Sequence, residues 1–185
     1  MRWILSLIFL LGLSGNLTAQ TPLQQARNLF ETAPDKEADA EKLLALGEEA
    51  NADPRVQGYS ASASMILADH YWNPISKLNS FLEGKERLEA IIASNPELFE
   101  LRFLRLLIQS QVPDIMDYKM NIEEDKKFLV EHFSTFVQEP ENKKFASKVY
   151  GYLKGLNLFE PGTLATFQAI LESNSLAQWR SRKKW

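Results

Sequence analysis

Cysteine is absent from the 185 residues, and histidine occurs only twice, at His70 and His132. Without thiols the chain forms no disulfide, has no thiol nucleophile or cysteine metal site, and offers no attachment point for the lipid of a lipoprotein. The two histidines lie far apart in sequence, and neither has a second metal ligand at helical spacing. We therefore interpret both as structural and expect no metal site.

Motifs of the common catalytic classes are also missing. The sequence contains no Gly-x-Ser-x-Gly nucleophile turn, no phosphate-binding loop and no dinucleotide fingerprint. The acidic stretch 114–125 lacks the alternating oxygen ligands and the central glycine of a calcium loop. The serines of 60–64 have no histidine placed to activate them. We therefore expect a non-catalytic protein without a cofactor.

Charge is nearly balanced, with 21 Lys and Arg against 24 Asp and Glu and a formal net charge of −3. A mildly acidic chain is a poor general partner for nucleic acid, which requires a basic face. The exception is the segment 175–185, which contains Arg180, Arg182, Lys183 and Lys184. These cations suit contact with an anionic lipid or polymer, but we favour a solvated, basic C-terminal tail.

The one long apolar run lies at the N-terminus. Arg2 precedes an almost entirely apolar run, Trp3 to Leu13, and a small residue, Ala19, follows a short polar stretch. This order is typical of a secretory signal peptide, and the run is shorter than the roughly 20 residues that span a bilayer. We predict a signal peptide over 1–19, cleavage between Ala19 and Gln20, and a periplasmic or secreted protein without a transmembrane helix.

The remaining chain has helical periodicity and almost no strand pattern. Thr21, Asp53, Asn73 and Asn95 each precede a proline, which is the pairing of a good N-cap with proline at the first helical position. We predict an all-α domain over 20–174 with about eight helices. The expected helices are 22–33, 36–50, 54–72, 74–93, 96–110, 121–137, 140–154 and 163–173.

Three stretches share one layout of a helix, a short turn, a proline and another helix. They are centred on Pro54, Pro96 and Pro140. Recurrence of this kind is typical of stacked helix pairs, and residues 89–96 (EAIIASNP) resemble the end of a tetratricopeptide repeat. The resemblance implies antiparallel helix pairs stacked as a short α-solenoid that binds other proteins. Separately, 102–107 with 121–128 is similar to a stretch in uncharacterised exported bacterial proteins, which implies no activity.

A narrow polar stripe crosses the otherwise apolar helix expected at 96–110. A helix that is apolar on all sides is usually buried, and buried arginines need a carboxylate or an anion. We interpret the stripe as a salt-bridge network with the next helix, and keep a site for an anionic ligand as the alternative. The stripe consists of Arg102, Arg105 and Gln109, and its expected partners are Glu123, Glu124 and Asp125.

One aromatic group has two interpretations. Tyr71 and Trp72, with Tyr59 nearby, form either a binding surface or core packing at a helix end, and we favour packing. Overall we predict an exported helical-repeat protein that acts as a protein–protein interaction module. The alternative is a carrier for a small anionic ligand or a lipid.

Overall fold

The computed structural model describes residues 20–49 and 52–182, and these residues form eight α-helices, one 3₁₀ helix and no strand. The prediction of an all-α fold with eight helices is confirmed. The elements are α1 (Pro22–Thr32), α2 (Glu37–Leu46), α3 (Pro54–His70), α4 (Pro74–Ser94), α5 (Phe99–Gln111), η1 (Asp114–Met116), α6 (Ile122–Gln138), α7 (Phe145–Gly155) and α8 (Pro161–Arg182).

Three helices begin at the predicted cap and proline. Thr21 Oγ1 accepts a hydrogen bond from the Gln24 amide at 3.2 Å. Asp53 and Asn73 accept from the amides two residues further on, each at 2.8 Å. In each case proline takes the first helical position, where its missing N–H leaves no bond unmade.

Two predicted helix starts are wrong. Asn95 ends α4, because its side-chain amide donates to the Ile91 carbonyl at 2.9 Å, and α5 begins at Phe99 instead of Pro96. Pro140 likewise opens a series of turns, and α7 begins at Phe145. The helices that follow the three recurring prolines therefore start at different distances from them.

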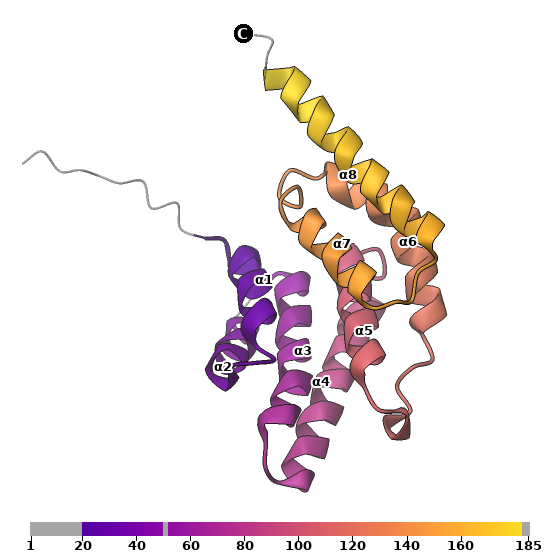
Figure 1. Cartoon of the computed structure of the whole chain (residues 1–185). Coiled ribbons are helices and arrows are strands. Elements are labelled where there is room, and N and C mark those ends of the chain that lie inside the picture. The colour runs from indigo at the N-terminus through magenta and orange to yellow at the C-terminus, as the bar shows by residue number, and fades with distance from the viewer. Residues whose placement is uncertain (1–19, 50–51, 183–185) are drawn as a thin grey trace, which may run out of the picture.

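The last helix is longer than predicted. We expected it to end near residue 173, but α8 continues to Arg182, so the predicted domain boundary at 174 falls inside it. Ser173 and Ser175 do not interrupt it, because their hydroxyls donate to carbonyls three residues earlier at 2.9 and 2.7 Å. Figure 1 shows the end of α8 running past α6 and α7, away from the other helices.

Consecutive helices pack against one another along most of the chain, and α1, α3 and α5 also contact one another in series (Figure 1). Side chains also join α1 to α7. Lys148 of α7 forms an ion pair with Glu31 near the C-terminal end of α1. The guanidinium of Arg27 in α1 lies 4.3 Å from the centre of the Phe145 ring at the start of α7. The core is centred on α5, where Leu101, Phe103 and most of their neighbours are fully buried. The expectation that this helix is buried is confirmed.

Small residues bring α3 and α4 close together. A Cβ added at Gly84 of α4 would lie 2.5 Å from the Ala61 carbonyl oxygen of α3. Since a backbone atom cannot move away cheaply, only glycine fits there, and α4 remains continuous through it.

The predicted signal peptide and Ala19 lie outside the described residues, while Gln20 is exposed just before α1. Within the described ranges, none of the helices is both long enough and apolar enough to cross a bilayer.

Candidate functional site

The predicted polar stripe on α5 is a network of ion pairs. Arg105 is 3% exposed, and its guanidinium donates two hydrogen bonds to Asp125 of α6, both at 2.7 Å. Its remaining nitrogen, Nη1, donates a hydrogen bond to Glu89 of α4 at 2.7 Å. A two-pronged contact of this kind fixes the relative orientation of the two groups. Asp125 is a partner that we predicted, whereas Glu89 is one that we did not.

Arg102 lies at the outer end of the same stripe. It donates to Glu124 at 2.7 Å and to Asp125 at 3.2 Å, and its guanidinium lies 5.3 Å from the centre of the Phe128 ring. Glu123, the third expected partner, instead pairs with Lys126 on its own helix.

Gln109 is fully buried at the inner end of the stripe. Its amide nitrogen lies 3.4 Å from Asn121 Oδ1, while its carbonyl oxygen has no hydrogen-bond partner among the described residues. An anionic ligand at Arg102 or Arg105 would have to displace the carboxylates that already occupy these arginines. We therefore interpret the stripe as a structural network that joins α4, α5 and α6, and not as a site for an anionic ligand.

The pKa shifts in this network have opposing causes. Burial raises the pKa of Asp125 above its usual value, although Arg105 and Arg102 act to lower it. Burial lowers the pKa of Arg105, but the hydrogen bonds and charge of Asp125 and Glu89 outweigh it and raise the pKa overall. The hydrogen bond from Arg102 holds the pKa of Glu124 below its usual value. Burial and Glu89, which accepts the Tyr118 hydroxyl at 2.6 Å, raise the pKa of Tyr118.

A second buried polar cluster, which we did not predict from the sequence, lies on another side of α5. Glu100 accepts hydrogen bonds from Arg27 Nε of α1 and from the Tyr59 hydroxyl of α3, both at 2.9 Å. Arg27 also donates to the second Glu100 oxygen and to the Asn142 side chain before α7. Arg55 Nη1 lies 3.9 Å from the same carboxylate.

A sequence signal for this cluster exists. Arg27 lies between the apolar positions of α1, and Glu100 lies between Phe99 and Leu101 on a largely apolar helix, outside its polar stripe. A charged residue in such a position needs a buried partner. The sequence does not indicate which partner, because Arg27 and Glu100 are 73 residues apart.

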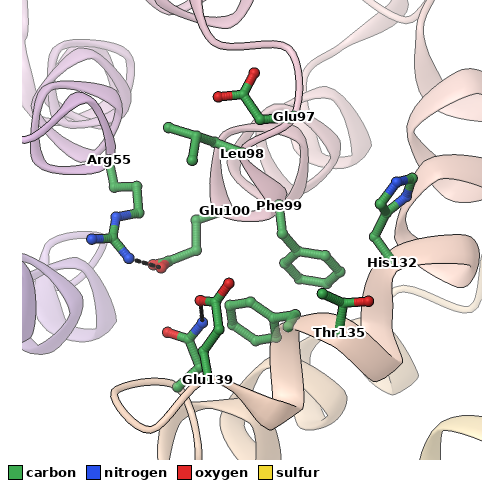
Figure 2. A pocket seen from close by; sticks show the side chains of 10 residues that line it. Arg55, Glu97, Leu98, Phe99, Glu100, His132, Thr135 and Glu139 are labelled. Atoms are coloured by element: carbon green, nitrogen blue, oxygen red, sulfur yellow. Dashed lines mark hydrogen bonds and ion pairs between the residues drawn. The ribbon is translucent and has the colours of Figure 1, made fainter.

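A small hollow of about 90 Å³ opens beside Glu100 and Arg55 (Figure 2). It also borders His132, but Figure 2 shows the Phe99 ring between His132 and Glu100. Proton transfer needs an acid and a base within about 3 Å or joined through a water. Burial and Glu100 raise the pKa of Tyr59 well above its ordinary value, which keeps its hydroxyl a donor. We therefore interpret this cluster as one that holds α1, α3, α5 and the 139–144 turns together.

A larger hollow of about 630 Å³ lies between the end of α2 and the first half of α4, with α3 beneath it. We call it the trough, and its lining includes Glu48, Ser64, Trp72, Ser76, Asn79 and Glu83. Within the described part of the chain, the side chains of Glu48, Ser76, Asn79 and Glu83 have no hydrogen-bond or ion-pair partner. These polar groups are therefore available to a binding partner.

Trp72 stands at the rim of the trough and is 95% exposed. Our interpretation of the aromatic group as core packing holds for Tyr59, which is fully buried against Phe30, and is wrong for Trp72. Trp72 occupies the turn that joins α3 to α4 (Figure 1). The adjoining face of α4 is apolar as well, because Ile75, Leu78 and Leu82 are all exposed. A tryptophan beside an exposed apolar stripe is typical of an interaction surface.

Among the described residues, no group of three or more acidic or histidine side chains is placed to hold a metal ion. No protein-family model matches the chain, and neither the curated proteins nor the solved structures include one that is similar to it.

Proposed function

We propose that the protein is an exported, non-catalytic protein–protein interaction module and that the trough is its binding surface. The observation that carries the proposal is Trp72, which is 95% exposed beside unpaired polar side chains. Exposing a whole indole to water is unfavourable, and tryptophan is the residue type most enriched at the energetic centres of protein interfaces.

The lining of the trough suits a polypeptide. The amide of Asn79 and the hydroxyl of Ser76 both donate and accept hydrogen bonds, as the peptide groups of an extended segment require. The stripe of Ile75, Leu78 and Leu82 offers apolar side chains beside them. The volume of about 630 Å³ is that of a small-molecule site, but the hollow is open to solvent and does not bury most of a ligand's surface, so it better suits a few side chains of a partner.

Charge indicates what kind of segment fits. Glu48 lines the trough from the turn after α2 and Glu83 lines it from α4, and within the described ranges neither carboxylate forms an ion pair. A partner that places a lysine or arginine between them gains from both. The same two carboxylates repel a small anion or an acidic lipid, so the trough supports the interaction module and not the carrier.

Selection from a library of displayed random peptides tests the proposal. We expect the purified protein to enrich cationic peptides, and the variant Trp72→Ala to lose most of that binding. The variant Ile115→Ala is the matched control, because it removes another strongly exposed apolar side chain outside the trough. Peptides that bind the protein and both variants equally would exclude the trough as the binding surface.

A further inference from the structure

The end of α8 has chemistry that complements the trough. Asn174 donates to the Val137 carbonyl of α6 at 2.7 Å, but two residues later Leu176 is 57% exposed. The sequence from there carries two tryptophans, Trp179 and Trp185, and four cations, which are Arg180, Arg182, Lys183 and Lys184. We call residues 176–185 the basic segment.

The fold keeps the described part of the basic segment, 176–182, apart from the trough of the same molecule. Figure 1 shows α8 leaving the bundle at the end opposite to the turn between α3 and α4, where Trp72 lies. Helix α8 is continuous to Arg182, so the backbone of its last turns continues away from the bundle. An encounter between the two surfaces therefore requires a second molecule.

We propose that the trough of one copy binds the basic segment of a second copy, so that the protein self-associates. This inference rests on the proposed function of the trough. Lysine or arginine side chains of the segment lie between Glu48 and Glu83, and a guanidinium or indole of the segment covers Trp72. Each molecule carries one trough and one segment, so the contact joins unlike surfaces and builds either a reciprocal pair or a chain of copies.

Sedimentation of the purified protein over a range of concentration and salt tests this inference. We expect a mass above that of the monomer at low salt, which falls as salt screens the charges. Two charge-reversal variants are compared: Glu48→Lys with Glu83→Lys in the trough, and all four cations of the basic segment replaced by glutamate. Each variant alone has like charges on both surfaces and should associate at least tenfold more weakly.

Mixing the two variants in equal amounts gives a sharper test. The reversed trough of one variant then meets the reversed segment of the other, and the wild-type pairing is also restored, so association should return. Glu123→Lys with Glu131→Lys carries the same change of charge on exposed positions of α6 and should associate as the wild type does. A wild-type protein that is a monomer throughout, or variants that associate unchanged, would refute self-association.

Sedimentation and peptide selection together distinguish a failure of self-association from a failure of the proposed function. A monomeric protein that still selects cationic peptides through Trp72 refutes the self-association and leaves the interaction module standing. A protein that selects no peptide through the trough loses both. Circular dichroism of each variant checks that the helices are intact.

Discussion

Replacement of Glu100 by glutamine removes one charge from the buried cluster that joins α1, α3 and α5. The side chain of Glu100 is 1% exposed, and it accepts hydrogen bonds from Arg27 and from Tyr59. Glutamine has nearly the same shape but leaves the Arg27 guanidinium buried without its counter-ion. Breaking a buried pair in this way costs about 3–5 kcal/mol, and we expect the lower end, about 3 kcal/mol, because the amide oxygen still accepts one bond.

Urea unfolding followed by circular dichroism measures this change. A domain of this size is stable by about 5–15 kcal/mol, so the variant should still fold. With a slope of about 2 kcal/mol per molar urea, a loss of about 3 kcal/mol lowers the midpoint by about 1.5 M. The slope itself should not change, because the same surface is exposed on unfolding.

Two comparisons make the prediction specific. Glu124→Gln also removes a carboxylate paired with an arginine, but the Glu124 side chain is 56% exposed, so we expect a loss below about 1 kcal/mol. Arg27→Met combined with Glu100→Gln should cost less than the sum of the single changes, by at least about 1 kcal/mol, because the two groups interact directly. If Glu100→Gln and Glu124→Gln destabilise the protein equally, the buried cluster does not hold the helices together.

Further predictions concern packing, pH and processing. Gly84→Ala should destabilise the protein by about 1–3 kcal/mol in the same urea assay because its Cβ meets the Ala61 carbonyl, whereas Gly151→Ala, with open space around it, should stabilise α7 by up to about 1 kcal/mol. The hydrogen bond from Arg55 lowers the pKa of Asp53, so its contribution to stability is present above about pH 4 and is lost as the pH falls through the folded-state pKa. Asp53→Asn keeps the cap but removes the titrating carboxyl. The free energy of unfolding that is lost between pH 6 and pH 2 should therefore be smaller in the variant than in the wild type, by less than about 1 kcal/mol, as measured from urea midpoints. Mass spectrometry of the protein exported from a bacterial host should show Gln20 as the first residue; a chain that retains residues 1–19 would contradict cleavage there.

Local signals in the sequence predicted most of the helices. Asp53 and Asn73 bond to the first turns of α3 and α4, so the residues that make the start are adjacent in the chain. Asn95 misled the prediction because the same side chain also caps the end of a helix, and here it bonds backward to Ile91. Which of the two roles an asparagine takes depends on the packing of both helices.

Of the two buried polar clusters, one was predicted from the sequence and the other was not. Arg105 and Asp125 were predicted to pair because they lie on consecutive helices that contact each other. The pair of Arg27 and Glu100 was not, because helices distant in sequence meet only through the tertiary fold. Trp72 was misassigned for a related reason: its exposure depends on which helices end beside it, and the sequence of the turn does not specify that.

The affinity of one selected cationic peptide for three proteins bears most directly on the role of the trough. Titration by fluorescence anisotropy should give a dissociation constant at least tenfold weaker for Trp72→Ala than for the wild type, since loss of an exposed aromatic anchor costs about 2 kcal/mol or more of binding. Ile115→Ala should bind as the wild type does. Equal affinity for all three proteins would contradict a binding surface at the trough.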